Sequence, residues 1–287
     1  MSRAEQWKNK KIGLVLSGGG AKGAYQIGMF RALEELGLAE QIRVISGTSI
    51  GALDGMAYAA VGNQAVRSMM HGFGEQVAAG GRQTSHEQIE VSREAVKRGE
   101  VTMEQFVSDS AFSEFNVEML TQFLRELLPD QKIAACSREV YICAYSLNHG
   151  RPEYFHLNGL EPGDQRKLIL ASASLPFVFP AVEYKGNYYL DGGVIPPICG
   201  AEPERADKIP LKPLLAEDLD AILVDFLNPA DRIDHSGVPE HVEYLELRPS
   251  RPLEKYPGEG TLNFSKERLL ENELLGYQDT MKLFTNI

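Results

Sequence analysis

Length, composition and charge together describe an ordinary globular protein. The chain has 287 residues, of which 43% are hydrophobic and 24% are charged, so disordered and collagen-like classes are excluded. Its 29 basic and 40 acidic side chains give a net charge of −11, which argues against a nucleic-acid partner. No apolar stretch reaches the roughly 20 residues of a membrane-spanning helix, and three cysteines without a CxxC pair indicate a reduced, cytoplasmic protein.

The beginning of the chain alternates strands, glycine turns and helices. The apolar run Lys11–Ser17 predicts a strand, which ends at three consecutive glycines. Apolar residues at three- and four-residue spacing predict a helix over residues 24–36. Ile42–Ser46 predicts a second strand, and a sharp turn leads from it into a small-residue helix from Ile50 to about Ala60. This order of elements predicts a parallel α/β sheet.

The rest of the chain continues this pattern within one domain. Residues 63–128 read as helices, and residues 80–100, which lack an apolar stripe at their start, are a candidate lid. Later strands and helices are predicted at Val140–Leu147, Pro162–Ser172, Val182–Leu190 (a hairpin), Ala221–Val224, Val242–Leu247 and Ser265–Phe284. We expect a tail at residues 1–9 and a single domain at residues 10–287, with a loop insertion at about 195–213.

A GxSxG pentapeptide connects the second predicted strand to the helix that follows it. Its residues are Gly47, Thr48, Ser49, Ile50 and Gly51. A serine nucleophile requires a strained strand-to-helix turn that presents its hydroxyl, and flanking glycines let the backbone bend that sharply. The first amides of the next helix favour negative charge nearby. The motif therefore predicts that Ser49 is a nucleophile.

The glycine-rich loop after the first strand fits two mechanisms. It comprises Gly18, Gly19, Gly20, Ala21, Lys22 and Gly23. A GxGxxG loop can hold the pyrophosphate of a dinucleotide, or its backbone N–H groups can form an oxyanion hole. The dinucleotide interpretation expects an acid after the second strand, where this chain instead has GxSxG. The oxyanion hole is therefore favoured, and a nucleotide-binding oxidoreductase remains the alternative.

A serine nucleophile also needs a base, and the chain offers two kinds. His235 and His241 follow in the sequence, but neither lies in a motif. Asp191-Gly192-Gly193 closes the predicted hairpin strand, where the two glycines would let the carboxylate project beyond the strand end. We expect Asp191 to be the general base.

These motifs resemble the patatin-like phospholipase family. The resemblance rests on Gly18–Gly23 as the oxyanion motif, Gly47–Gly51 as the elbow and Asp191–Gly193 as the aspartate motif, with Ala171–Pro176 ahead of the last. It implies a three-layer α/β/α fold with a mostly parallel central sheet. It also implies a Ser49–Asp191 dyad that hydrolyses acyl esters of glycerophospholipids or related lipids. Neither a metal nor an organic cofactor is implied, and the expected partners are a lipid or phospholipid substrate and, transiently, a membrane surface.

Two features are less regular. The family commonly carries an Asn-x-Pro element soon after its aspartate motif, but this chain has Lys208-Ile-Pro210 only later, toward the end of the predicted insertion. Lys22 either pairs with an anionic headgroup or a nearby acid, or is a solvated lysine in the first helical turn.

A catalytically silent regulatory protein of the same fold is a further alternative. The sequence leaves the oligomeric state open.

Overall fold

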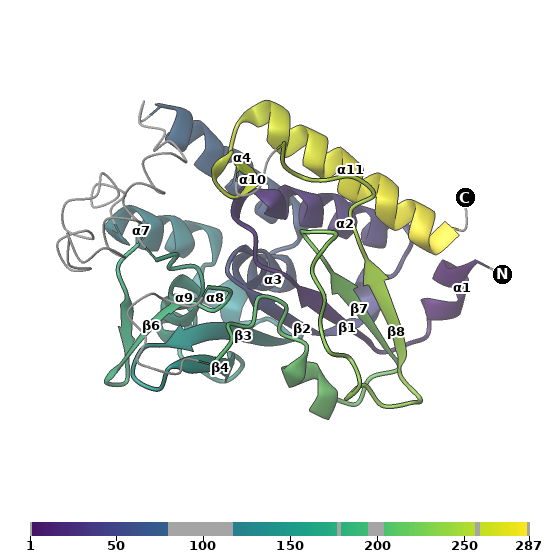
Figure 1. Ribbon diagram of the computed structural model, residues 1–287, viewed down its shortest axis with the longest axis horizontal. Helices are drawn as coiled ribbons and strands as arrows, with labels where there is room; N and C mark the ends of the chain where they lie inside the picture. Colours follow the sequence, from purple (N-terminus) through teal and green to yellow (C-terminus); the bar gives the residue numbers. More distant parts are fainter. Residues whose placement is uncertain (1, 80–116, 177–178, 195–203, 256–258, 286–287) are drawn as a thin grey trace.

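A mixed β-sheet runs through the described part of the chain (Figure 1), which comprises residues 2–79, 117–176, 179–194, 204–255 and 259–285 of the computed structural model. Its strand order is β5-β6-β3-β2-β1-β7-β8, and β4 pairs with β3. The strands are β1 (Ile12–Leu16), β2 (Ile42–Thr48), β3 (Glu139–Ser146), β4 (Arg151–His156), β5 (Val182–Tyr184), β6 (Asn187–Asp191), β7 (Ala221–Asp225) and β8 (Glu243–Leu247). From β3 to β8 all neighbours are parallel. The predicted α/β class with a mostly parallel sheet is confirmed.

Helices and short 3₁₀ turns connect these strands. They are α1 (Arg3–Trp7), η1 (Gly20–Gly23), α2 (Ala24–Glu35), η2 (Ala39–Gln41), α3 (Ile50–Ala60), α4 (Asn63–Ala79), α7 (Val117–Leu127), α8 (Asp130–Ala134), α9 (Pro162–Ser172), η4 (Lys212–Ala216), α10 (Glu259–Leu262) and α11 (Lys266–Thr285). The lid predicted at residues 80–100 lies outside the described residues, as does the insertion up to residue 203.

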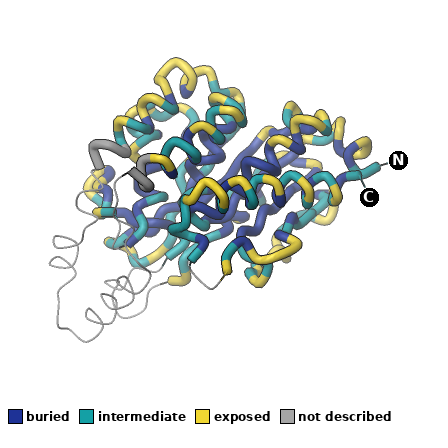
Figure 2. The backbone as a smooth tube through the Cα atoms, turned by 90° about the horizontal axis from the view of Figure 1, so that it is seen from above, coloured by how far each residue is buried: buried dark blue, intermediate teal, exposed yellow. Residues whose placement is uncertain are grey.

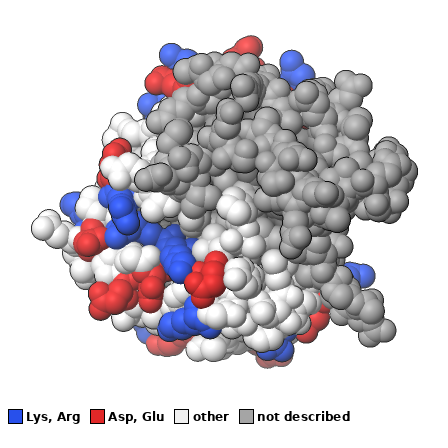
Figure 3. Space-filling view, turned by 90° about the vertical axis from the view of Figure 1, so that its left-hand side faces the viewer, with Lys and Arg blue, Asp and Glu red and all other residues white. Residues whose placement is uncertain are grey.

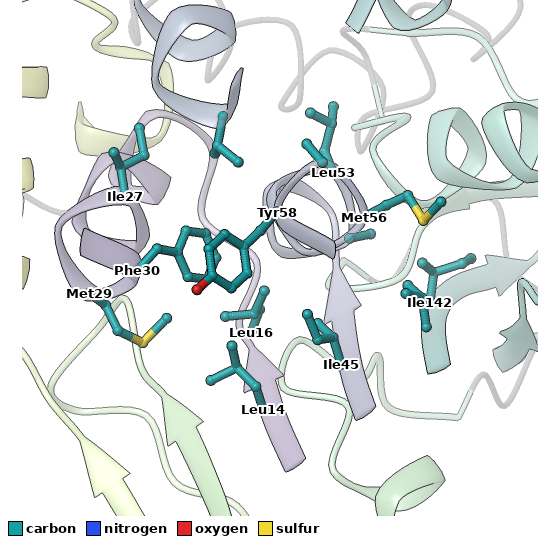
Figure 4. Close-up of a cluster of buried hydrophobic side chains, with 14 of the residues drawn as sticks. Leu14, Leu16, Ile27, Met29, Phe30, Ile45, Leu53, Met56, Tyr58 and Ile142 are labelled. Carbon is teal, nitrogen blue, oxygen red and sulfur yellow. The ribbon is translucent and has the colours of Figure 1, made fainter. Parts of the chain in front are cut away.

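The main core lies between the sheet and helices α2 and α3. Figure 4 shows the rings of Phe30 and Tyr58 between these two helices, above Leu14 and Leu16 of β1. The two rings stack in parallel with their centroids 4.0 Å apart. Helix α11 lies along the outer side of α2 in Figure 1. Burial of this apolar surface fixes α2 and α3 over the sheet, and so fixes the loops that precede each helix.

A second, smaller core covers the opposite face of the sheet. Val15 and Val224 on the strands contact a cluster that includes Ile209 and Leu214. In the described residues this layer is formed by the 3₁₀ helix η4 and by irregular segments, so it is thinner than the helical layer. In Figure 2 the buried residues run through the middle of the molecule, and the exposed residues lie on its outer turns. The segment leading into η4 is therefore part of the fold's packing.

The N-terminal segment differs from the predicted tail. Residues Arg3–Trp7 form helix α1, and Trp7 is completely buried. Its ring packs edge-on against that of Phe284, with the centroids 5.1 Å apart. The polar composition of the segment hid this contact, because one large aromatic side chain supplies most of the buried area.

Most predicted elements occur where the periodicity placed them. The hairpin β5–β6 turns at Lys185 and Gly186, both with positive φ angles, which is typical of a tight hairpin turn. Strand β4 was not predicted, because its half-exposed side chains lack the alternation on which strand prediction depends. No helix within the described ranges combines the length and apolar composition needed to cross a bilayer.

Candidate active site

A change of pairing partner along β3 brings two strand ends together. Thr48, the last residue of β2, pairs with Cys143. Asp191, the last residue of β6, pairs with the next residue, Ala144. Since β4 occupies the other edge of β3, β2 and β6 approach each other along the same edge from opposite directions. Ser49, which follows Thr48, therefore lies beside Asp191.

The GxSxG segment forms a strained strand-to-helix turn. Ser49 has a φ of 58° and a ψ of −124°, and Ile50 begins helix α3 directly after it. A Cβ atom on Gly47 would lie 2.2 Å from the carbonyl oxygen of Gly51, and one on Gly51 would lie 2.4 Å from that of Leu16. Both flanking positions thus require glycine. A left-handed serine held by close backbone contacts is the geometry expected of a nucleophile elbow.

The segment Ala171–Pro176 supports both halves of the site. Ser172 Oγ accepts a hydrogen bond of 2.9 Å from the Ser49 amide and donates one of 2.6 Å to the Cys143 carbonyl. The carbonyl oxygen of Ser174 accepts a hydrogen bond of 2.9 Å from the Asp191 amide. The sequence placed this segment near the aspartate motif but did not predict that its two serines would hold the two strand ends.

The Asp191 carboxylate is buried beside the serine. It accepts a hydrogen bond of 2.8 Å from the Gly193 amide. Burial raises the pKa of Asp191 to about 6, while the nearby Ser49 hydroxyl, the Gly193 amide and the charge of Lys208 act in the opposite direction. Gly192 lies against the backbone of β3, where a Cβ atom would be 2.4 Å from the Cys143 carbonyl oxygen. A carboxylate with this pKa can accept a proton near neutral pH.

The glycine-rich loop passes directly over the serine. A Cβ atom on Gly18 would lie 3.1 Å from Ser49 Cβ, and one on Gly20 would lie 2.1 Å from the Thr261 carbonyl oxygen. Gly20 has a φ of 58°, so this position also requires glycine. The Gly18 amide donates to the Lys208 carbonyl at 2.9 Å, whereas no hydrogen bond from the Gly19 or Gly20 amide occurs among the described residues. These two amides are therefore available to an oxyanion.

The end of the loop is packed into the protein. Ala21, Lys22 and Gly23 are buried at the start of α2. The Lys22 ammonium forms an ion pair of 3.1 Å with Glu254, and its side chain is only 6% exposed. Of the interpretations of Lys22, the solvated lysine is wrong and the nearby acid is correct.

The segment Asp207–Ile209 joins all three sequence motifs. The Asp207 carbonyl accepts a hydrogen bond of 2.9 Å from Thr48 Oγ1, and the Asp207 amide donates one of 2.9 Å to the Gly192 carbonyl. The Lys208 carbonyl completes the set by accepting from Gly18. Lys208-Ile-Pro210 thus lies at the site although it belongs to the predicted insertion, which sequence analysis could not establish.

Two buried carboxyl groups lie against the end of the glycine loop. Neither oxygen of Asp54 has a hydrogen-bond partner among the described residues, and a Cβ atom on Gly23 would lie 2.9 Å from Asp54 Oδ2. Asp225, at the end of β7, accepts a hydrogen bond of 2.7 Å from Gln26 Nε2. Burial and the charge of Asp225 raise the pKa of Asp54 well above its usual range, and burial raises the pKa of Asp225 to about 7. No sequence motif indicated this pair.

The other candidate base and a cavity lie away from Ser49 and Asp191. His235, the alternative base, stacks on the ring of Tyr244 with the centroids 4.6 Å apart. Within the described ranges no group of three or more His, Cys, Asp or Glu side chains could hold a metal ion. A cavity of about 340 Å³ is lined by Met56, Val140 and Cys136, among others. Val140 lies near the beginning of β3, so this cavity is at the other end of the strand from the dyad.

Comparison with known proteins agrees with this geometry. The family model described as patatin-like phospholipase matches residues 14–201, a range that contains the elbow, the glycine loop and the aspartate motif. The chain belongs to the patatin-like phospholipase family. This membership confirms the resemblance drawn from the three motifs, and it removes the support for a nucleotide-binding oxidoreductase.

Relatives of this family member include much longer proteins. Lysophospholipase nte1 from Aspergillus terreus is 34% identical over 186 residues, which are 65% of this chain and 10% of that protein. Lysophospholipase nte1 from Aspergillus oryzae is 31% identical over 189 residues, with the same coverage. Among solved structures, VipD from Legionella pneumophila aligns with 95% of this chain and 66% of VipD, at 16% identity and a TM-score of 0.46. The chain thus spans about a tenth of the two fungal proteins.

Replacing Asp54 by asparagine is expected to reduce the pH dependence of stability. Because the pKa of Asp54 is raised in the folded state, its proton stabilises the fold fully below the pKa of the unfolded chain. This contribution is lost as the pH rises through the folded pKa. In Asp54→Asn the free energy of unfolding should therefore fall less steeply as the pH rises above the usual aspartate pKa of about 4, by up to about 1.4 kcal/mol per pH unit.

Urea unfolding followed by circular dichroism at several pH values measures this slope. Glu240→Gln is the matched control, since Glu240 is exposed and its replacement should leave the slope at the wild-type value. An Asp54→Asn protein with the wild-type slope would contradict the assignment of a buried proton to Asp54.

Proposed function

We propose that this protein is a serine lipid acyl hydrolase that cleaves acyl esters of glycerophospholipids or related lipids. The observation that carries the proposal is the position of the Ser49 hydroxyl, on a strained turn, beside the buried Asp191 carboxylate. The names of the fungal relatives, which are lysophospholipases, support an ester of this class. The proposed activity is therefore that of a carboxylic ester hydrolase similar to a phospholipase A.

In the proposed first step Ser49 Oγ attacks the ester carbonyl carbon. Its proton passes to Asp191, and the carbonyl oxygen takes up the negative charge. The amides of Gly19 and Gly20, together with that of Ala21, stabilise this oxyanion, with the N-terminal amides of α3 adding a favourable field. Asp191 then returns the proton to the leaving alcohol, which leaves an acyl-enzyme on Ser49.

In the second step a water molecule hydrolyses the acyl-enzyme. Asp191 takes a proton from the water, whose oxygen attacks the acyl carbon, and then returns that proton to Ser49 Oγ as the fatty acid departs. The raised pKa of Asp191 supports this role, because a base with a pKa nearer the working pH is the more effective one. Every proton transfer in the scheme is assigned to this dyad.

The proposed substrate indicates where in the cell the enzyme would act. A lipid ester is presented by a membrane or a micelle, so we propose transient contact with a membrane surface by an otherwise cytoplasmic protein. Attachment would be weak, since stable anchoring requires two membrane-binding signals.

Replacing the nucleophile is expected to abolish covalent labelling. An alkyl fluorophosphonate should label the wild-type protein at Ser49 and leave Ser49→Ala unlabelled.

Asp191→Asn should lower kcat for a p-nitrophenyl ester by at least about 100-fold, because the carboxylate accepts the serine proton. Mass spectrometry of the adduct and steady-state kinetics measure the two effects.

His235→Ala is the matched control for the base, since His235 stacks on Tyr244 and should be dispensable. Full turnover in Asp191→Asn combined with loss of turnover in His235→Ala would overturn the dyad. A wild-type protein that neither reacts with the fluorophosphonate nor turns over the ester would support the catalytically silent regulatory alternative.

Activity is expected to rise with pH around the pKa of Asp191. Burial raises this pKa to about 6, and only the ionised carboxylate can accept the Ser49 proton. For a soluble p-nitrophenyl ester, kcat/KM should therefore increase from about pH 5 to about pH 7 and level off above. A midpoint near the usual aspartate value, about 4, would show that Asp191 is not the buried base.

Replacing Gly20 by alanine is expected to damage the oxyanion hole. The added Cβ atom would meet the Thr261 carbonyl oxygen at 2.1 Å, at a position with a φ of +58°. The loop must then shift, and loss of one oxyanion donor lowers kcat by about 100-fold or more. Gly72→Ala is the control, because a Cβ atom at Gly72 meets no atom within 4 Å; equal kcat values in the two variants would contradict the assignment.

A further inference from the structure

Lys208 lies against both turns that carry the dyad. A Cβ atom on Gly18, next to Ser49, would be 3.7 Å from Lys208 Cγ, and one on Gly193, next to Asp191, would be 3.4 Å from the same atom. The hydrogen bond between the Lys208 carbonyl and the Gly18 amide fixes the backbone at this point. The side chain therefore begins between the nucleophile and the base.

The charge of Lys208 is both close to the dyad and open to solvent. It lowers the pKa of the Asp191 carboxyl. The side chain is 31% exposed, and Nζ forms an ion pair of 2.8 Å with Asp231, which is 26% exposed. An ammonium has three N–H donors, and among the described residues Asp231 is the one hydrogen-bond acceptor of Lys208 Nζ. Solvent screens this partly exposed ion pair, and its ammonium retains N–H donors that can bind a second anion.

The other lysine of the site is not available in this way. Lys22 lies beneath the glycine loop, is almost completely buried and pairs with Glu254. On the described part of the face shown in Figure 3, Lys and Arg side chains lie beside Asp and Glu, and the whole chain carries a net charge of −11. A negatively charged substrate therefore needs a cation close to the reacting bond. Lys208 is in that position.

We propose that Lys208 binds the phosphate oxygens of a glycerophospholipid while Ser49 attacks its acyl ester, and so favours phosphate-bearing lipids over neutral ones. The inference rests on the proposed function, since it assigns the substrate class of the same site. Only the glycerol unit separates the scissile ester of such a lipid from its phosphate. One cation beside the dyad can therefore contact the phosphate during the reaction, and charge-assisted hydrogen bonds are the strong ones.

The test compares two substrates that differ in the phosphate group. A 1-acyl lysophosphatidylcholine and a monoacylglycerol with the same acyl chain are presented in the same detergent micelles. In Lys208→Gln the kcat/KM for the lysophospholipid, divided by that for the monoacylglycerol, should fall by about tenfold or more, chiefly through KM. Lys208→Arg should restore the ratio. Lys212→Gln, an exposed lysine on the same segment, should keep the wild-type ratio.

An unchanged ratio in Lys208→Gln would overturn the proposal, and so would an equal loss with both substrates, which would indicate a merely structural role. A binding measurement distinguishes failure of the Lys208 assignment from failure of the proposed function. In the Ser49→Ala background, calorimetry should show that Lys208→Gln weakens the binding of lysophosphatidylcholine by about tenfold. The binding of monoacylglycerol should weaken much less. That result would uphold the Lys208 assignment even if the wild-type protein hydrolysed neither lipid.

A third measurement distinguishes a lipid headgroup from a free anion. Inorganic phosphate is titrated into the Ser49→Ala protein under the same conditions. Binding much weaker than that of lysophosphatidylcholine supports recognition of phosphate within a lipid. Binding of equal strength, lost in Lys208→Gln, would show a site for the free anion and would overturn the lipid assignment.

Discussion

The site depends on the hydrogen-bond register of strand β3. Residues up to Cys143 pair with β2, and residues from Ala144 onward pair with β6. Ser49 and Asp191 meet because this change of partner falls between two consecutive residues. In a β-sheet a slip of one residue also moves each side chain to the opposite face, so the apolar residues of β3 that form the core fix the position of the dyad.

Hydrogen bonds from other segments hold that junction on both sides. Ser172, the last residue of α9, and Ser174, just after it, bind the two strand ends, and the segment Asp207–Ile209 binds them and the glycine loop from the opposite layer. The left-handed conformation of Ser49 is costly by itself. Contacts of this kind are what allow such a conformation to persist in the folded protein.

The electrostatics of the site follow from the same burial. Asp191 is removed from water, which raises its pKa, yet the Ser49 hydroxyl, the Gly193 amide and the charge of Lys208 favour its ionised form. Asp54, on helix α3, has no hydrogen-bond donor among the described residues, and burial together with the charge of Asp225 raises its pKa well above the usual range. The two buried aspartates thus differ in the partners that offset their burial.

The sequence predicted those parts of the structure that depend on local chemistry. Apolar periodicity predicted the strands and the helices that pack on the sheet. The glycines in the motifs around Ser49, Gly20 and Asp191 indicated where the backbone turns sharply or packs closely. The anchoring of Trp7, the ion pair of Lys22 and the contacts of Lys208 could not be predicted. Each depends on a residue more than 200 positions away or on a segment within the predicted insertion, and no local pattern encodes such a partner.

Both ends of the described chain lie on the same side of the molecule, away from α7 (Figure 1). Besides the contact between Trp7 and Phe284, Arg3 Nη1 donates a hydrogen bond of 2.5 Å to the Leu283 carbonyl. Domains with adjacent ends tolerate circular permutation and insertion into a host protein. A short linker across this gap, with new ends opened at an exposed loop tip, would leave every hydrogen bond among β2, β3 and β6 in place. The contact between α1 and α11 would then lie within one continuous segment of the permuted chain.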